Sequence, residues 1–428
     1  MSQTIQKKTK ISIIFIALAG QIAWMVENQY FNVFMYEKIA PVPMYISFMV
    51  AASAIVATFT SIIMGSYSDV KGKRKSLLFF GFIFWTITTS IFPFSAFFPI
   101  VELAIATAII FDCIMTFFGS TAYDATFNAY ITDITTLENR GKALSLVQIM
   151  TLVSILITYG FAGFIIEALG YFIFFFIVGG LVGIFGITGA YLAEKPKELK
   201  FLDRSVLEHL KTTFKKENLH ENKDVFLVLT GATIWGIGFN IFFPFIIVYL
   251  QNYPLISLDI LTASIVVFIA FLIAMIASYP VGITIDKIGR KKVTIISIVF
   301  ESISLIFFAF MVDLPLLIIF GTMWVFFMTT WTIASNTWIK DLYPEKKYGQ
   351  FSGYFILFTV LFTMIPGPLI GGWLSETFGI PFVDENGIPG RIPVPIMFVV
   401  AAIIILLAVI PIVFASEKNK KKETGTAN

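Results

Sequence analysis

The sequence contains few charged residues and almost no cysteine or histidine. Of its 428 residues 13% are charged and 57% are hydrophobic, whereas an ordinary soluble domain carries about 25% charged residues. A single soluble core stops growing at roughly 250–300 residues, so a soluble protein of this length could not bury so much apolar surface. The same composition excludes a disordered chain. It predicts a polytopic helical membrane protein, since the apolar runs are too long and too continuous for barrel strands.

Other absences exclude whole classes of chemistry. Cys113 is the only cysteine, so no intrachain disulfide can form, and a lone thiol in a helix is usually a small apolar filler. His209 and His220 both lie in a polar stretch, so neither is suited to a proton relay inside a membrane. No phosphate-binding loop of the G-x-x-x-x-G-K-[ST] type is present, so ATP is not the expected energy source. We expect no cofactor and no metal centre, and a net charge of +3 gives no reason to expect nucleic acid as a partner.

Twelve apolar stretches are each long enough to cross a bilayer, which takes about 20 residues. They lie near residues 11–35, 43–68, 76–98, 100–131, 142–168, 171–193, 225–250, 258–284, 292–312, 315–339, 350–377 and 394–415. The first run is too long for the apolar region of a cleaved signal peptide, so it is predicted as a membrane helix. The longest polar stretch, 194–224, is predicted to be a cytoplasmic linker between two six-helix bundles, 1–193 and 225–428, the second with a basic tail.

The distribution of lysine and arginine predicts the orientation. If the N-terminus is cytoplasmic, 28 of the 30 basic residues fall in cytoplasmic segments, and only Lys38 and Arg391 do not. This follows the tendency of cytoplasmic loops to be positive. A missed or extra helix would scramble the asymmetry. The sequence therefore predicts a multi-pass protein of the cell membrane with both termini in the cytoplasm.

Two short patterns recur at equivalent places in the two halves. The first pattern follows spans two and eight, and its members are Gly65, Asp69, Gly72 and Arg74, and Gly282, Asp286, Gly289 and Arg290. The second follows spans four and ten and reads Asn128-Ala-Tyr130-Ile-Thr-Asp133 and Asn336-Thr-Trp338-Ile-Lys-Asp341. Two matched segments indicate a duplicated six-helix unit in parallel orientation. Such halves meet around an axis along the membrane normal, with the substrate site between them near the midplane.

The first pattern, G-x-x-x-D-x-x-G-x-R/K-K, resembles the signature of the major facilitator superfamily. The copy in the second half is complete, whereas the first copy has Val70 where a basic residue is usual. The resemblance implies a fold of two bundles around a central cavity, with these loops latching the halves when the cavity opens outward. Gly65 and Gly282 would let two helices approach closely. The alternative is an ordinary solvated, positively charged loop.

A narrower resemblance concerns spans one and two. The stretch from Trp24 to Asn32, with Met49-Val-Ala-Ala-Ser53-Ala, is similar to the sugar:cation symporters, including the sucrose-transporter-like branch. Drug:proton antiporters typically carry a Gly-Pro-x-x-Gly-Gly element in span five. Here span five reads Tyr159-Gly-Phe-Ala-Gly163, and a Gly367-Pro368 element lies in span eleven instead. The lack of this element in span five favours a symporter over a drug:proton antiporter.

Four acidic residues lie inside predicted spans: Glu27, Asp112, Asp124 and Glu301. A charge at mid-bilayer costs on the order of 3 kcal/mol on insertion scales, and no lysine or arginine falls in the middle of a span to neutralise one. We predict that these carboxyls couple transport to a cation, a proton or sodium. Asp124 is the first candidate, because Thr121 and Asn128 share its helix face and add further oxygens. The alternative is a permanently protonated carboxyl that only ties helices together.

Aromatic and amide side chains on the same spans suit a neutral polar ligand, which binds by ring stacking and hydrogen bonds. The predicted ligand-binding residues are Gln21, Trp24, Asn28, Tyr123, Asn128, Gln148, Trp235, Asn240, Trp331 and Asn336. For Tyr130 and Trp338 a place in the interfacial aromatic belt is the favoured alternative. Organophosphates and dicarboxylates are disfavoured, because they need a fixed positive partner inside the membrane.

The sequence thus predicts a secondary active transporter that moves a small neutral solute, a sugar or glycoside, by alternating access. It would act as a monomer in the bilayer, coupled to protons or sodium. The first alternative is a proton-coupled exporter of hydrophobic or cationic compounds. A membrane enzyme or a sensor is the second, and the lack of a nucleophile–base pair or a metal set argues against an enzyme. The solute, the ion and the direction of transport stay open.

Overall fold

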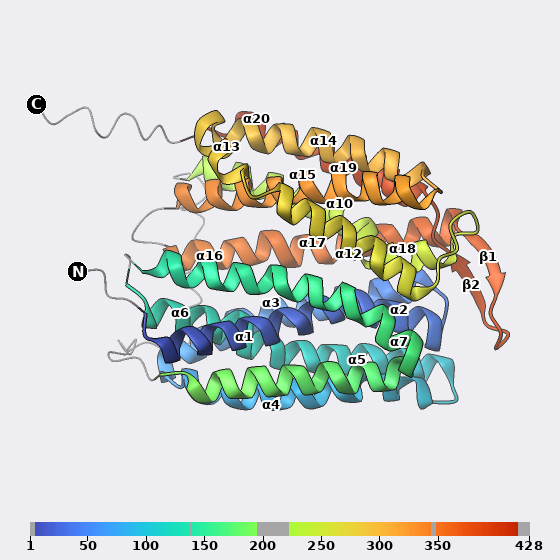
Figure 1. Ribbon diagram of the computed structural model, residues 1–428, viewed down its shortest axis with the longest axis horizontal. Coiled ribbons are helices and arrows are strands. Elements are labelled where there is room, and N and C mark those ends of the chain that lie inside the picture. Colours follow the sequence, from blue (N-terminus) through green and yellow to red (C-terminus); the bar gives the residue numbers. More distant parts are fainter. Residues whose placement is uncertain (1–4, 137–138, 195–221, 344–347, 418–428) are drawn as a thin grey trace, which may run out of the picture.

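The computed structural model describes residues 5–136, 139–194, 222–343 and 348–417. The chain is an all-α membrane protein, as predicted, and its helices run side by side along the long axis of the molecule (Figure 1). The helices of the first half are α1 Lys7–Val26 with η1 Glu27–Phe31, α2 Asn32–Phe34 and η2 Met35–Ile39; α3 Pro43–Lys71; α4 Arg74–Ile91 with η3 Phe92–Phe97; α5 Val101–Gly119 with η4 Ser120–Phe127 and α6 Asn128–Ile134; and α7 Arg140–Leu192.

The second half follows the same plan. Its elements are α10 Lys223–Phe242 with η5 Phe243–Phe245 and α11 Ile246–Asn252; α12 Ile260–Ala277 and α13 Val281–Ile288; α14 Arg290–Phe310; α15 Leu314–Leu342; α16 Tyr348–Ile356 with η7 Leu357–Leu361, α17 Phe362–Met364 and α18 Pro366–Phe378; the strands β1 Ile380–Val383 and β2 Pro389–Ile392; and α19 Ile396–Leu407 with α20 Val409–Phe414. The predicted linker lies almost wholly outside the described residues, so the predicted domain boundaries stay a prediction.

The described residues form eleven helical segments that are long and apolar enough to cross a membrane. One of them, α7, is long enough for two crossings. α7 has 53 residues, which would make a helix of roughly 80 Å against a hydrocarbon core of about 30 Å. Gly170 interrupts it with φ 81° and ψ 168°, a backbone conformation that favours glycine because it has no Cβ. The break falls between the fifth and sixth predicted spans, so the described residues contain twelve helical segments long enough to cross a membrane.

The two ends of the molecule differ. α1 begins and α20 ends at one end, which we call the termini end, and the hairpin of β1 and β2 lies at the other, which we call the hairpin end (Figure 1). The strands pair antiparallel, with Ile380 opposite Ile392. This hairpin was not predicted from the sequence, because four-residue strands interrupted by proline carry almost no periodic signal.

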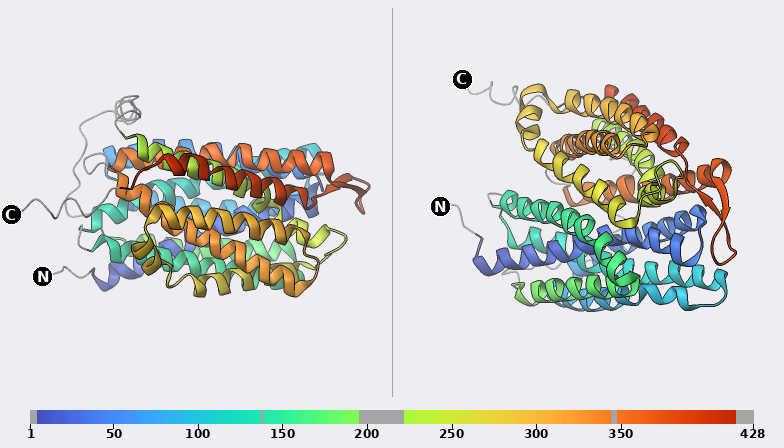
Figure 2. Two further views of the ribbon diagram at one scale, coloured as in Figure 1. Left: turned by 90° about the horizontal axis from the view of Figure 1, so that it is seen from above. Right: turned by 45° about the vertical axis from the view of Figure 1, so that its right-hand side comes forward.

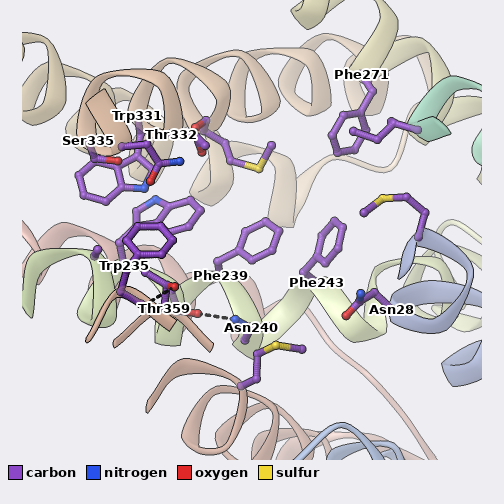
Figure 3. Close-up of a pocket in the computed structure, with 18 residues that line it drawn as sticks. Asn28, Trp235, Phe239, Asn240, Phe243, Phe271, Trp331, Thr332, Ser335 and Thr359 are labelled. Carbon is purple, nitrogen blue, oxygen red and sulfur yellow. Dashed lines mark hydrogen bonds between the residues drawn. The ribbon is translucent and has the colours of Figure 1, made fainter. Parts of the chain in front are cut away.

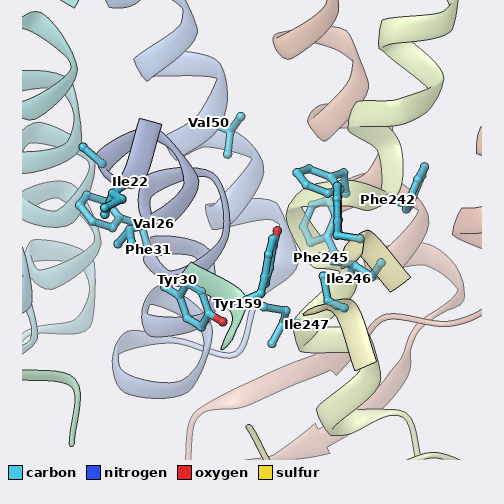
Figure 4. Packing of buried hydrophobic residues seen from close by; sticks show 14 of the residues in the cluster. Ile22, Val26, Tyr30, Phe31, Val50, Tyr159, Phe242, Phe245, Ile246 and Ile247 are labelled. Carbon is cyan, nitrogen blue, oxygen red and sulfur yellow. The ribbon is translucent and has the colours of Figure 1, made fainter. Parts of the chain in front are cut away.

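The two halves lie one above the other, with the first half at the bottom of both Figure 1 and the right-hand view of Figure 2. They pack most closely where α7 meets α12 and where α3 meets α18. Glycine makes the first approach possible, because a Cβ on Gly163 would lie 2.8 Å from the carbonyl oxygen of Ile260. Beside it, Tyr159 lies between Tyr30 and the η5–α11 segment (Figure 4), and its ring stacks on Phe271 at 5.6 Å.

Hydrogen bonds between the halves gather in the part of the bundle nearer the hairpin end. Glu37 accepts from Gln251 across the interface at 2.7 Å and from Tyr171 of its own half at 2.8 Å. Further bonds join Gln29 to the carbonyl of Phe243, Tyr30 to Ser264, Ser47 to the carbonyl of Pro368, and the backbone N–H of Arg391 to Pro41. The structure is therefore closed at the hairpin end.

Candidate functional site

Two of the predicted coupling residues lie in π-helical turns. Glu27 begins η1, and Asp124 lies within η4, where the side-chain hydroxyl of Thr126 donates to the carbonyl of Thr121 at 2.6 Å. A π-turn widens the helix locally and changes the direction of the side chains that follow; such turns occur frequently at functional sites. η4 lies close to α1, because the ring of Tyr123 occupies the space where Gly20 lacks a side chain.

Three carboxyls gather in the first half. Glu27 accepts a hydrogen bond from Thr116 at 2.8 Å, and its carboxyl faces that of Asp112 within hydrogen-bonding range. Both are buried, and one oxygen of Asp112, Oδ1, has no hydrogen-bond partner among the described residues. Asp124 lies on the same helical segment as Asp112 and accepts from Ser120 at 2.9 Å. The structure therefore brings together three of the four acids that the sequence singled out.

The oxygens predicted to assist Asp124 point elsewhere. The hydroxyl of Thr121 donates to the carbonyl of Phe117 at 2.7 Å, and the amide of Asn128, which is exposed, donates to the backbone carbonyl of Asp124 at 2.9 Å. Short polar side chains in helices commonly bond back to a carbonyl one turn earlier. Ser120, which was not predicted, donates to the carboxyl from one helical turn earlier.

The fourth acid lies in the second half. Glu301 is fully buried in α14, and its Oε2 accepts a hydrogen bond from the indole of Trp235 at 2.9 Å. Its other oxygen, Oε1, has no hydrogen-bond partner among the described residues. Glu301 thus contacts a residue that the sequence predicts as ligand-binding, whereas the other three acids lie in the opposite half.

A cavity of about 390 Å³ lies between the halves beside Trp235. Its main wall is a row of aromatic rings in which Trp235 stacks on Phe239 at 5.3 Å and Phe239 stacks on Phe243 at 4.4 Å, with Trp331 beside Trp235 at 5.4 Å (Figure 3). Polar groups are few, and they are Asn28, Asn240, Thr332, Ser335, Asn336 and Thr359. No acidic or basic side chain lines this cavity among the described residues. The arrangement suits a neutral ligand with a flat face.

A second cavity, of about 460 Å³, adjoins the first. The two share five lining residues, which are Ile155, Phe271, Met328, Thr332 and Asn336. The second reaches toward the termini end past Gln148 and Thr337 to Lys340. Lys340 lines this cavity, although the sequence predicts it only as one of the basic residues in the cytoplasmic loop after span ten. Lys340 lies four residues after Asn336, so the two share one helix face. This spacing could have indicated that Lys340 lies near the ligand-binding residues.

The predicted ligand residues divide into two groups. Six of them line the cavities: Asn28, Gln148, Trp235, Asn240, Trp331 and Asn336. The other four do not line them: Gln21 donates to Tyr123 at 2.9 Å, the ring of Trp24 lies tilted against that of Trp85 at 4.9 Å, and Asn128 is exposed.

Sequence reasoning also missed the phenylalanines of the wall. With 48 phenylalanines in the chain, a ring that faces the cavity cannot be told from one that faces lipid. Tyr130 and Trp338 are each 1% exposed, which places them inside the bundle rather than in an interfacial belt.

The repeated loops at the termini end show the internal symmetry in their ion pairs. Arg74 is buried and pairs with Asp69 at 2.5 Å and with Asp133 at 2.8 Å. In the second half Arg290 pairs with Asp341 at 2.8 Å. Each arginine thus ties its loop to the second repeated pattern of the same half. Asp286, predicted to join the latch, is exposed.

The glycines of these loops have different roles from those expected. A Cβ on Gly65 or Gly282 would meet nothing within 4 Å, so in this structure neither allows a close helix approach. Gly72 and Gly289 instead adopt φ of 64° and 99°, a left-handed conformation that other residues adopt at a cost. These two glycines let the chain turn sharply between consecutive helices.

Comparison with known proteins gives one family. The family model of the Major Facilitator Superfamily matches residues 12–258 and 254–428. An uncharacterised transporter of this type from Methanocaldococcus jannaschii is 28% identical over 207 residues, 48% of this chain and 49% of that protein. The multidrug resistance protein MdtG of Proteus mirabilis is 26% identical over 207 residues, 47% of each chain. The chain thus spans about half the length of these curated relatives.

Solved structures share the fold across nearly the whole chain. The nucleoside transporter NupG has a TM-score of 0.70 at 14% identity, covering 95% of this chain and 98% of its own. A D-xylose-proton symporter has a TM-score of 0.70 at 16% identity, covering 96% and 98%. At such identities the likeness shows the fold alone, whereas the family model covers almost all of the sequence. The chain belongs to the major facilitator superfamily.

Proposed function

We propose that the protein is a secondary active transporter that moves a neutral solute across the membrane by alternating access. The observation that carries the proposal is the cavity between the halves, which is lined by stacked aromatic rings and a few amides and is closed toward the hairpin end. The closed end and the second cavity that extends toward the other end fit one of the two states of such a cycle. The protein would act as a monomer.

The solute that fits the cavity best is a sugar bearing an apolar group, such as a glycoside. Sugar rings stack on aromatic faces, and the amides of Asn28, Asn240 and Asn336 supply hydrogen bonds to hydroxyls. Pockets of about 300–1,000 Å³ hold drug-sized ligands. The two adjoining cavities, of about 390 and 460 Å³, have more room than a single sugar ring needs. The apolar group of the glycoside would pack against the aromatic wall of the cavity.

A proton is the coupling ion that we propose. Within the described residues, the side chains that bond to Asp124 are Ser120 and the indole of Trp24, so one hydroxyl is the extra oxygen there, and hard cations need several oxygen ligands. Glu27 and Asp112 face each other in a buried site, where two negative charges would repel strongly. A proton removes one of the two charges without demanding a coordination shell.

Transport by the purified protein in liposomes tests the proposal. An imposed proton gradient should drive accumulation of p-nitrophenyl glucoside, and a protonophore should abolish it. A sodium gradient alone should not drive it. Movement of no glycoside under either gradient would overturn the proposed solute class, and accumulation driven by sodium would overturn the proposed ion.

A second candidate is an exporter of hydrophobic compounds. The predominantly apolar wall of the cavity favours it, as does the likeness to a multidrug resistance protein. The same liposomes discriminate between the two. An exporter would expel a lipophilic dye in exchange for protons, so the pH gradient that drives glycoside uptake would oppose dye movement in the same direction.

We also propose that the termini end faces the cytoplasm, so that the cavity is open to the cell interior. The support is the gathering of 28 of 30 basic residues in the predicted cytoplasmic segments. Single cysteines at Lys291 and Gly387 in a Cys113→Ala background test it with a membrane-impermeant thiol reagent on intact cells. The cysteine at 387 should react and the one at 291 should not, and the reverse pattern would invert the topology.

A further inference from the structure

Glu301 is a buried acid with a single hydrogen-bond donor, and that donor belongs to the cavity wall. The side chain is 0% exposed, Oε2 accepts from the indole N–H of Trp235 at 2.9 Å, and Oε1 has no partner among the described residues. An ionised carboxylate in a membrane normally needs several donors or a positive partner. One donor for two oxygens is too few for a permanent charge, and the unpartnered oxygen is a place for a proton.

No other charged side chain among the described residues lies near enough to share this role. Near a helix end lies every charged group on Glu301's own helix and on the elements packed against that helix or against α10. These groups are Lys223 and Asp224 on α10, Asp286 and Lys287 on α13, Arg290, Lys291 and Lys292 on α14, Asp313, Lys340 and Asp341 on or beside α15, and Glu376 on α18. The sequences of α19 and α20 contain no charged residue. The state of Glu301 therefore depends on its own proton and on Trp235.

Trp235 connects the carboxyl to the cavity. Its ring stacks on Phe239 at 5.3 Å with an angle of 11° and lies against Trp331 at 5.4 Å, so one face helps to form the wall. Its only polar hydrogen points to Glu301. A hydrogen bond to an ionised acceptor is roughly twice as strong as one to a neutral acceptor, so the charge on Glu301 determines how firmly the ring is held.

We propose that Glu301 binds a proton together with the ligand that stacks on Trp235, and that the indole N–H is the physical link between the two sites. The proposal rests on the transport function proposed above and assigns the link to two named side chains. A ligand on Trp235 excludes water from the wall and leaves the carboxyl with no compensation for a negative charge. The neutral, protonated carboxyl is then the form that accompanies the bound ligand.

Thermodynamic linkage between proton and ligand determines whether ligand affinity rises or falls with pH. If the ligand binds with a proton, then by reciprocity the proton binds more tightly to the liganded protein. Ligand affinity should therefore fall as the pH rises, by up to tenfold per pH unit where Glu301 is ionised in the free protein. This sign corresponds to symport, in which ion and solute occupy the protein together.

The first experiment needs no ligand and no transport. The purified protein is titrated with acid and base while its tryptophan fluorescence and the infrared carbonyl band of protonated carboxyls are recorded. We expect a fluorescence step in the wild type that disappears in Glu301→Gln, which keeps an acceptor for the indole, and in Trp235→Phe, which removes the donor. Trp235→Phe should keep the carbonyl band of Glu301, and Glu301→Gln should lose it. The same fluorescence step in both variants would overturn the link.

Ser302→Ala is the matched control, because Ser302 is the buried neighbour of Glu301 and its hydroxyl also has no hydrogen-bond partner among the described residues. It should keep the step and the band. Because Glu301→Gln removes a buried acid and could alter folding, Trp235→Phe provides an independent variant that leaves the acid in place. Size-exclusion profiles show whether each variant is folded.

The second experiment adds p-nitrophenyl glucoside as the probe and measures its affinity across pH. The wild type and Ser302→Ala should lose up to tenfold in affinity per pH unit on the alkaline side. Glu301→Gln should bind with an affinity that depends less on pH. Affinity that rises with pH in the wild type, or unchanged pH dependence in Glu301→Gln, would contradict proton co-binding. A wild type that does not bind the probe would count against the proposed solute class alone, since the ligand-free titration still decides the link.

Discussion

At the scale of single residues, the sequence located the membrane acids but not the groups that they contact. The four membrane acids were identifiable because a charge inside a span is costly, and all four are engaged in or beside the bundle core. Their partners were not identifiable. Ser120 lies one helical turn before Asp124, but Thr121 and Asn128 are as near in the sequence and do not bond to the carboxyl. Trp235 reaches Glu301 by a contact between helices, which leaves no pattern in the sequence.

Replacement of Asp124 by asparagine tests the coupling role. The change keeps the size and the hydrogen bond from Ser120 but removes the group that can carry a charge. We expect loss of accumulation driven by a proton gradient, while exchange of solute across the membrane continues, since exchange does not require release of the ion. Ser120→Ala should keep accumulation. Normal gradient-driven accumulation in Asp124→Asn would make the residue structural and leave Glu27, Asp112 and Glu301 as candidates.

A second residue-scale prediction concerns pH and the start of α12. Asp259 accepts from the backbone N–H and the hydroxyl of Thr262, each at 2.7 Å, and the backbone hydrogen bond holds the pKa of Asp259 below its ordinary value. A depressed pKa means that the stabilisation is present above the unfolded value, about 3.9, and is lost as the pH falls through the folded value.

Loss of this helix cap should lower stability by about 1 kcal/mol. In detergent, Asp259→Ala should therefore melt below the wild type at pH 7, and the difference should disappear at strongly acidic pH. Asp259→Asn is the matched control, since asparagine caps a helix without titrating. A melting difference between wild type and Asp259→Ala that is the same at both pH values would rule out the carboxylate as its source.

At the scale of elements, the helices follow from the length of the apolar runs, and the irregular pieces do not. Each of the twelve predicted spans has a counterpart, including the division of α7 at Gly170. The π-turns η1, η2, η4 and η7 were not predicted, because one extra residue in a turn does not disturb an apolar run. The hairpin was not predicted either, because its strands are only four residues long, and it contacts the first half where the backbone N–H of Arg391 donates to Pro41.

That contact gives a prediction for the closed end. A Cβ on Gly390 would lie 2.6 Å from a ring carbon of Pro41 and 2.7 Å from its carbonyl oxygen. Gly390→Ala should therefore push the hairpin away from the first half and weaken closure at this end. A cysteine at Asn28, which lines the cavity, should then react several-fold faster with an impermeant thiol reagent from the hairpin side.

Gly180→Ala provides the matched control, because a Cβ there would meet nothing within 4 Å. Both variants are made in a Cys113→Ala background, so that the engineered cysteine is the sole thiol. Equal labelling rates in the two variants would mean that the hairpin does not hold the end closed.

At the scale of the whole molecule, the two halves share a framework and differ in chemistry. Lys75 donates to the carbonyls of Tyr191 and Ala193, and Lys291 donates to those of Val413 and Ala415, so each lysine ties its loop to the last span of its half. The sequence repeat predicted this framework in outline. Counted from the glycine of each copy, Arg74 stands one residue further along than Arg290, and the ion pairs nevertheless make the two arginines equivalent.

The chemistry is divided unequally between the halves. Three acids cluster in the first half, and most of the cavity wall belongs to the second. The sequence showed that three of the four membrane acids lie in the first half. It could not show that most of the cavity wall belongs to the second half, because the face that a helix turns to the cavity is set by packing between helices that are far apart in the chain. Glu301 with Trp235 is where an acid reaches the cavity wall.

The termini end gives the last prediction. Arg74 and Arg290 each pair within their own half, and Asp286 is exposed, so the acid is available to the opposite half when the termini end closes. Asp286→Asn should remove this contact and favour the state seen here, which is closed at the hairpin end. We expect slower transport, unchanged folding, and slower labelling of a cysteine at Asn28 from the hairpin side. Asp313→Asn, an exposed acid at the start of α15, should change none of these. Wild-type turnover and labelling in Asp286→Asn would reduce this residue to part of a solvated loop, and the two arginine pairs would then stabilise each half without a role in the cycle.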